Sequence, residues 1–238
     1  MCGRYTLTHP AEALAELLGA DAGLAAADLA PRYNIAPTQV VPIVRHAPNG
    51  RREAALLRWG LVPAWADDPA IGNRLINARA ETVDSKPAFR DSFRAQRCLV
   101  PADGFYEWRA EGRRRQPIYI RRRDGHPFAF AGLWSRWRPQ RPSGGAALDT
   151  FTILTTEPSS QIAPIHDRMP LVLRGDENGF WLEAPAAEVR AWLHGLGARE
   201  LPFETFAVDP RVSSPKVDDA RCIEPLAAPT AKLFRDLD

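Results

Sequence analysis

The chain has 238 residues, of which 45% are hydrophobic and 25% are charged, a composition typical of a globular protein. Its formal net charge of only +2 excludes the strongly basic balance that by itself announces a nucleic-acid-binding protein. No apolar run is long enough to span a bilayer, and the first residues lack the basic-then-apolar order of a signal peptide. We therefore expect a cytoplasmic protein.

The first third of the sequence predicts short, separate elements. A strand is expected at residues 4–8, followed by a short helix at residues 9–20, where Pro10 suits a first helical position. Residues 31–44 form an extended segment interrupted by prolines. Residues 52–65 are typical of a strand that runs into a turn.

The middle of the sequence predicts a β-meander over residues 95–135. Two strands meet at the turn Asp103-Gly104, and two more meet at Asp124-Gly125, a dipeptide that commonly forms hairpins. The remaining expected elements follow in chain order: a flexible loop at 139–148, strands at 149–159 and 166–175, an amphipathic helix at 185–197 and a short terminal helical stretch at 229–238.

Strands dominate this pattern, and no break in composition divides the chain. The sequence therefore predicts one α+β domain over residues 1–238, with a mostly antiparallel, barrel-like β-sheet core and peripheral helices. We expect a monomer.

The three cysteines, Cys2, Cys98 and Cys222, are too few and too widely spaced for a disulfide framework. Neither a CxxC pair nor an HxxxH pair is present, so the sequence supports no structural metal site, and no cofactor is expected. Cys98 and Cys222 are typical of small buried apolar residues.

Cys2 differs from them because it directly follows Met1. Removal of Met1 would leave one residue with a free α-amine and a thiol, both partly nucleophilic near neutral pH. The amine can condense with an aldehyde to an imine, on which the neighbouring thiol closes a five-membered thiazolidine ring. From its position alone, the simpler interpretation is that Cys2 is an inert residue on a frayed terminus.

Two further residues are candidates for proton transfer. Glu107 lies among aromatic residues in GFYEW, where an apolar surrounding would raise its pKa and suit it to acid–base catalysis; it can equally be a charge on the solvent face of a strand. His166, in IHDRMP, precedes an apolar strand and can shuttle protons or simply bond to the backbone.

Asn77 and Arg79, in INARAET, would share one face of a strand. An amide beside a guanidinium can hold a sugar oxygen and a phosphate, and the alternative is a polar outer face.

Taken together, these stretches resemble the SOS response-associated peptidase (SRAP) family, the abasic-site DNA–protein cross-linking proteins. The resemblance rests on an ordered set of motifs: MCGRY, RYNIAPTQ, RWGLVPAW, INARAET, ADGFYEW, QPIYI and IHDRMPLVL. It implies the SRAP fold, removal of Met1, and a thiazolidine cross-link between Cys2 and the ring-opened sugar of an abasic site in single-stranded DNA.

The resemblance also implies roles for individual residues. Glu107 would act as the acid–base residue for imine formation, His166 would assist ring opening and reversal, and Asn77 would orient the opened sugar. The implied DNA contacts are arginines for phosphate, a threonine near the strand, a loop and an aromatic wedge: Arg4, Arg79, Arg168, Thr155, Asn34, Pro37 and Trp65. The chain departs from the family at Ala66, where a second aromatic residue is common, and we expect a thinner wedge for stacking on bases.

Two other functions stay open. Cys2 can serve an N-terminal-nucleophile peptidase or amidohydrolase, with its own amine as the base. The protein can also be a non-catalytic module that binds single-stranded DNA through arginines and Trp65.

Overall fold

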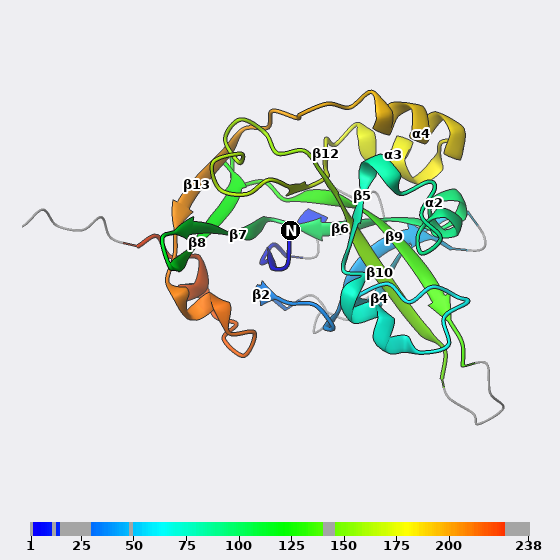
Figure 1. Ribbon diagram of the computed structural model, residues 1–238, viewed down its shortest axis with the longest axis horizontal. Coiled ribbons are helices and arrows are strands. Elements are labelled where there is room, and N and C mark those ends of the chain that lie inside the picture. The colour runs from blue at the N-terminus through cyan, green and yellow to red at the C-terminus, as the bar shows by residue number, and fades with distance from the viewer. Residues whose placement is uncertain (1, 11–12, 15–29, 48–49, 140–145, 227–238) are drawn as a thin grey trace, which may run out of the picture.

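The computed structural model describes residues 2–10, 13–14, 30–47, 50–139 and 146–226, which form two β-sheets with helices at the periphery (Figure 1). The first sheet has five strands in the order β13-β8-β7-β1-β2, which are Phe203–Ala207, Arg114–Arg122, Gly104–Glu111, Tyr5–Leu7 and Arg32–Ile35. The second has eight strands: β11 (Met169–Pro170), β10 (Leu148–Thr156), β4 (Arg52–Trp59), β3 (Val40–His46), β6 (Arg97–Ala102), β9 (Phe128–Trp137), β12 (Val172–Leu173) and β5 (Asn77–Arg79).

The helices are short. They are α2 (Arg90–Ala95), α3 (Glu177–Glu183) and α4 (Ala186–His194), with 3-10 turns η2 (Pro69–Arg74), η3 (Ala80–Thr82), η4 (Pro210–Ser213) and η5 (Ala220–Ile223). Figure 1 shows α2, α3 and α4 gathered at one end of the molecule. No helix among the described residues is long and apolar enough to cross a membrane.

The eight-stranded sheet closes on itself. Strand β10 pairs in parallel with β4 on one side and antiparallel with β9 on the other, which completes the ring β10-β4-β3-β6-β9. Trp59 and Phe151, from the paired strands β4 and β10, stack inside it with ring centroids 6.2 Å apart. The expected α+β fold with a mostly antiparallel, barrel-like core is confirmed, with parallel pairing only of β10 to β4 and to β5 among the described strands.

Aromatic packing joins the two sheets at β1. The buried ring of Tyr5 meets Trp59 edge-on at 5.3 Å and Phe130 at 5.8 Å between centroids. Burying large aromatic surfaces in this way is strongly stabilising. Because β1 also pairs with β7, the residues that precede it are fixed at the place where the two sheets meet (Figure 1).

The hairpin predicted at Asp124-Gly125 is wrong. Strand β8, before this turn, pairs with β7 and β13, whereas β9, after it, pairs with β6, β10 and β12. The hairpin is instead formed by β7 and β8, whose turn contains Gly112 at φ +60°. The expected meander is thus divided between two sheets.

The chain changes sheet at Asp103, between β6 and β7. The buried Asp103 carboxylate accepts hydrogen bonds from the hydroxyl of Thr6, from the amide and hydroxyl of Thr8, and from the amide of His9. These bonds satisfy a buried charge and fasten the segment after β1 to the crossing point, so the predicted turn at 103–104 connects two sheets.

The other predicted elements have mixed outcomes. The helix expected at 185–197 is confirmed as α4, with Val189 and Leu193 buried, and the strands expected at 4–8, 52–65 and 149–159 are confirmed as β1, β4 and β10. Most of the helix at 9–20, most of the loop at 139–148 and the terminal stretch at 229–238 lie outside the described residues.

Candidate active site around Cys2

Cys2 is fully buried and lies in the short segment that leads into β1. Its carbonyl oxygen accepts a hydrogen bond of 2.8 Å from Nδ2 of Asn77. Asn77 is the first residue of β5, which pairs in parallel with β10 through Ile153. This hydrogen bond ties the segment that leads into β1 of the five-stranded sheet to β5 of the eight-stranded sheet.

The second polar atom of Asn77 is free to bind something else. Its Oδ1 is buried and has no hydrogen-bond partner among the described residues. A buried acceptor without a partner is costly. Asn77 therefore presents an acceptor at Cys2 that suits a ligand hydroxyl or amine.

Glu107 lies on β7 with 2% of its surface exposed. Burial raises the pKa of Glu107 to about 7, because a carboxylate is disfavoured away from water. Burial also raises the pKa of the Cys2 thiol far above its ordinary value, and the charge on Glu107 raises it further. The carboxyl and the thiol are thus electrostatic neighbours, and the interpretation of Glu107 as a solvent-facing charge is excluded.

His166 comes from the loop between β10 and β11 and approaches Glu107. Its Nε2 is 3.8 Å from Oε2 of Glu107, while its Nδ1 accepts a 3.0 Å hydrogen bond from the amide of Arg168. Burial lowers the pKa of His166, so the ring is largely neutral at neutral pH. A carboxyl with a pKa of about 7 thus lies beside a neutral imidazole, a pairing that suits general acid–base chemistry.

The site contains no arrangement for a metal. Within the part of the chain that the structure describes, no three His, Cys, Asp or Glu side chains are grouped to hold a metal ion. The chemistry that the geometry supports is nucleophilic attack by Cys2 with proton transfer through Glu107 and His166.

Comparison with known proteins decides the family. Residues 1–215 match the profile of the SOS response associated peptidase (SRAP) family. The chain belongs to the SRAP family. It is 38% identical over 231 residues to abasic site processing protein YoaM of Bacillus subtilis, which covers 94% of this chain and 98% of the relative. It is 33% identical over 186 residues to abasic site processing protein YedK of Escherichia coli, covering 76% and 79% of the two chains.

Solved structures agree with this SRAP assignment. A crystal structure of a protein from Bacteroides thetaiotaomicron superposes with a TM-score of 0.83 at 26% identity, covering 95% of this chain and all of the other. A second, from Bordetella bronchiseptica, gives 0.71 at 27% identity, covering 87% and 100%.

Five of the seven predicted DNA-contacting residues of this SRAP chain fall into two groups by exposure. Arg79 and Trp65 are exposed, Trp65 to 51%, and Pro37 is half-buried in a turn. Asn34 and Thr155 are buried, at 0% and 1% exposure. The side chains of Asn34 and Thr155 thus face the interior of the fold, and a direct DNA contact by either residue stays a prediction.

Asn34 instead anchors a C-terminal segment, residues 209–225. Its Nδ2 donates to the carbonyl oxygens of Val212, Ser214 and Val217 at 2.6–3.1 Å. Its Oδ1 accepts from Nη1 of Arg4 at 2.8 Å. Every polar atom of the Asn34 side chain is used within the fold.

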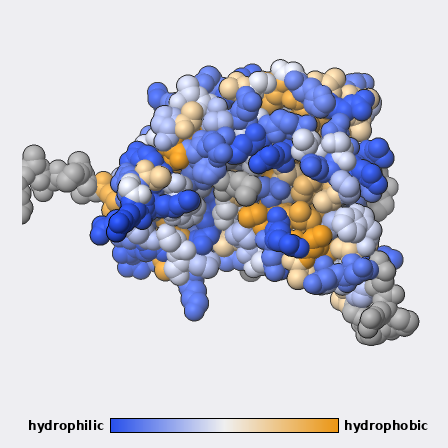
Figure 2. All heavy atoms as spheres, viewed as in Figure 1, coloured by the Kyte–Doolittle hydropathy of each residue, from blue (hydrophilic) through white to orange (hydrophobic). Residues whose placement is uncertain are grey.

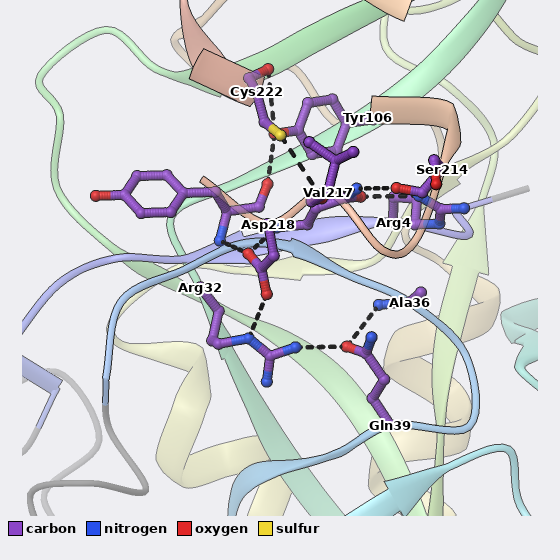
Figure 3. Close-up of polar contacts among 11 residues, drawn as sticks. Arg4, Arg32, Ala36, Gln39, Tyr106, Ser214, Val217, Asp218 and Cys222 are labelled. Carbon is purple, nitrogen blue, oxygen red and sulfur yellow. Dashed lines mark hydrogen bonds and ion pairs between the residues drawn. The ribbon is translucent and has the colours of Figure 1, made fainter. Parts of the chain in front are cut away.

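Arg4 is held by the same segment. Its Nη1 and Nη2 donate to the carbonyl oxygens of Val212 at 2.6 Å and Ser213 at 3.0 Å, and Figure 3 shows its guanidinium beside Ser214. At least three of its five N–H donors are therefore occupied, counting the bond to Asn34. These hydrogen bonds hold Arg4, and with it the residues next to Cys2, against the segment 209–225. They leave fewer donors of Arg4 for a phosphate.

Asp218 completes this network (Figure 3). One carboxylate oxygen accepts from Nε of Arg32 at 2.6 Å, and the other accepts from the amides of Tyr33 at 2.6 Å and Asn34 at 2.9 Å. Asp218 lies beyond the residues that match the family profile, and no motif in the sequence signals it.

Ala66 turns inward. It is 3% exposed and packs with Val62 and Trp137, whose Nε1 donates to the Ala66 carbonyl at 2.6 Å. Trp65 is thus the side chain of this pair that reaches the surface.

Figure 2 shows a largely hydrophilic face with apolar side chains gathered right of centre.

Proposed function

We propose that the chain processes abasic sites in single-stranded DNA by forming a covalent thiazolidine cross-link through Cys2, after removal of Met1. The observation that carries this proposal is the setting of Cys2, tied by its carbonyl to Asn77 next to a carboxyl that titrates near pH 7. The curated names of the relatives, abasic site processing proteins, support the same substrate.

The first bond would form between the Cys2 α-amine and the aldehyde carbon of the ring-opened sugar. His166 is positioned to move the proton that opens the sugar ring. The resulting carbinolamine loses its hydroxyl as water when Glu107 donates a proton, which leaves an imine. The unpartnered Oδ1 of Asn77 would accept from a sugar hydroxyl and hold the opened chain in line.

The second bond would form between the Cys2 sulfur and the imine carbon. Because the pKa of the buried thiol is raised, the sulfur arrives protonated and needs a base. Glu107, with a pKa of about 7, can take that proton and return it to the nitrogen as the C=N electron pair moves there. The five-membered ring contains one nitrogen and one sulfur, and a single water is released overall.

DNA would lie against the exposed side chains near this centre. Arg79 follows Asn77 on β5 by two residues and is exposed, so it can pair with a phosphate on the same face. Trp65 can stack on a base. Asn34 and Thr155 act from within the fold.

A denaturing gel tests the proposal. Protein whose loss of Met1 is verified by intact mass is mixed with a labelled single-stranded oligonucleotide that carries one abasic site. We expect a heat-stable slow band, its absence with Cys2→Ala and with an intact oligonucleotide, and its persistence with Cys98→Ala. Cross-linking by Cys2→Ala at the wild-type yield would falsify the proposal.

Cys2→Ser separates this proposal from the hydrolase alternative. A serine cannot form a thiazolidine, whereas an N-terminal-nucleophile hydrolase can keep amide cleavage with a hydroxyl. Loss of the stable band in Cys2→Ser supports cross-linking. Binding of the oligonucleotide by wild-type protein without any band would point to the non-catalytic module.

The burial of Cys2 also bears on how Met1 is removed. A fully buried residue is out of reach of a separate aminopeptidase once the chain has folded. The proposal therefore requires that Met1 is removed either before folding or by the chain's own site. Refolding a Met1-retaining preparation in the absence of any peptidase, followed by intact mass, distinguishes the two routes.

A further inference from the structure

The side chain of Arg168 is already occupied. Its Nη1 and Nη2 donate to the two carboxylate oxygens of Glu81 at 2.7 and 2.9 Å, and Nη2 also donates to the Thr155 carbonyl at 2.7 Å. The Nη1 and Nη2 donors that could bind two oxygens of a phosphate are thus already bound to the two oxygens of Glu81. With 15% of its side chain exposed, Arg168 is built into the fold.

The backbone of Arg168 acts on His166. Its amide donates to Nδ1 of His166 at 3.0 Å. A ring nitrogen that accepts a hydrogen bond carries no proton, so the neutral ring has its proton on Nε2. Nε2 is the atom that faces Glu107, at 3.8 Å from Oε2.

The nearby charge of Asp167 does not determine which ring nitrogen of His166 carries the proton. Oδ1 of Asp167 lies 2.9 Å from Nδ1 and would favour a proton there, but the Asp167 side chain is 88% exposed, so water screens it. The Arg168 amide therefore selects the Nε2–H form only while the loop 166–168 keeps its position.

Glu81 is placed to keep that loop in position. It lies in η3, directly after β5, where Ala80 before it and Val83 two residues after it are buried. Glu81 is four residues after Asn77, so it links the loop that carries His166 to the strand that holds the Cys2 carbonyl. Burial by itself would raise the pKa of Glu81, but the hydrogen bonds and charge of Arg168, a backbone hydrogen bond and the charge of Arg79 together lower it. The carboxylate is therefore charged at neutral pH.

We propose that Glu81 is a positioning residue: its fork on Arg168 holds the Arg168 amide against His166 Nδ1 and keeps the Nε2 proton directed at Glu107. The effect on the reaction rests on the proposed function, whereas the effect on the histidine does not. The competing interpretation is that Glu81 occupies Arg168 in place of a DNA phosphate and leaves when DNA binds.

The first test measures the histidine without DNA. Nitrogen NMR of protein labelled with ¹⁵N-histidine, with the His166 signals assigned from His166→Gln, reports which ring nitrogen carries the proton. We expect the Nε2–H form in wild type at pH 7.5 and a mixture of both forms in Glu81→Gln, with partial recovery in Glu81→Asp. An unchanged tautomer in Glu81→Gln would overturn the proposal.

A matched control is available at α3. Glu183 accepts two hydrogen bonds from the Arg52 guanidinium, at 2.6 and 3.1 Å, and is similarly exposed. Glu183→Gln removes the same charge and should leave the His166 signals unchanged. Glu81 has 44% of its side chain exposed, so its substitution is compatible with folding, which circular dichroism verifies.

The second test measures the reaction. With saturating abasic oligonucleotide, we expect Glu81→Gln to slow cross-linking about tenfold, a part of the 10²–10⁴ that general acid–base catalysis supplies, with unchanged affinity for an intact oligonucleotide. Tighter binding of that oligonucleotide, with a salt dependence steeper by about 0.7 in log–log slope, would instead show that Glu81 competes with a phosphate. If wild type forms no cross-link, the proposed function fails, and the NMR result still decides the role of Glu81.

Discussion

Replacing Glu107 by glutamine should make the protein more stable, increasingly so as pH rises. The pKa of Glu107 rises from an ordinary 4.5 to about 7 on folding, so the folded state binds this proton more tightly than the unfolded state. The stability that the proton contributes is complete below pH 4.5 and is lost as pH rises through about 7. Glutamine resembles the protonated acid and keeps this contribution at every pH.

The size of the effect follows from the two pKa values. A rise from 4.5 to about 7 corresponds to about 3 kcal/mol in the free energy of unfolding. Glu107→Gln should therefore exceed wild type by about 3 kcal/mol at pH 8 and by only about 1 kcal/mol at pH 5.

Urea denaturation at pH 5, 6, 7 and 8 measures this difference, with intact mass confirming the same N-terminus in both proteins. Glu204→Gln, at an exposed ion pair with Arg121, controls for the loss of a surface charge. A difference that stays constant with pH, or a destabilised Glu107→Gln at pH 8, would refute the reasoning.

In the same variant, cross-linking should slow much more than oligonucleotide binding weakens, and equal losses in both would make Glu107 a structural residue.

Three further predictions concern the fold and the DNA-facing surface. Asp218→Asn should lower the free energy of unfolding by about 1–3 kcal/mol in urea melts, because it weakens the bond to Arg32; no change would show that this ion pair is dispensable. Trp65→Ala should weaken binding of single-stranded DNA by about 1–3 kcal/mol in fluorescence anisotropy, and unchanged affinity would remove Trp65 from the interface. Gly60→Ala should cost at least about 2 kcal/mol, since Gly60 has φ +121° and a Cβ there would lie 2.6 Å from the Gly72 carbonyl oxygen; thermal melting at wild-type temperature would contradict this.

The strands were predictable because their signals are local. Alternating and β-branched runs predict two strands within 95–110 and one at 149–159, and all three are present as β6, β7 and β10. Their partners were not predictable in the same way. Asp124-Gly125 does make a tight turn, with Gly125 at φ +71°, yet the flanking strands enter different sheets because their partners are far away in sequence.

In the candidate site too, the residue types could be predicted from the sequence, whereas some of their partners could not. Cys2, Asn77, Glu107 and His166 each have a chemical signature, and the structure brings Cys2 to Asn77 and Glu107 to His166. The sequence could not show that the Asn34 amide is used within the fold, or that Arg168 is held by Glu81. An arginine or asparagine has the same letter whether its partner is a phosphate or a backbone carbonyl, and only the fold decides between them.

The bond between Arg4 and the Val212 carbonyl joins positions 208 residues apart. Contacts of such long sequence separation are slow to form, because closing the long intervening loop costs conformational entropy. During synthesis, Cys2 leaves the ribosome long before Val212, which lies 208 residues after Arg4. A chain made only as far as the β-sheets would therefore carry Cys2 without this contact, and the proposed chemistry of Cys2 would await translation of the segment that contains Val212.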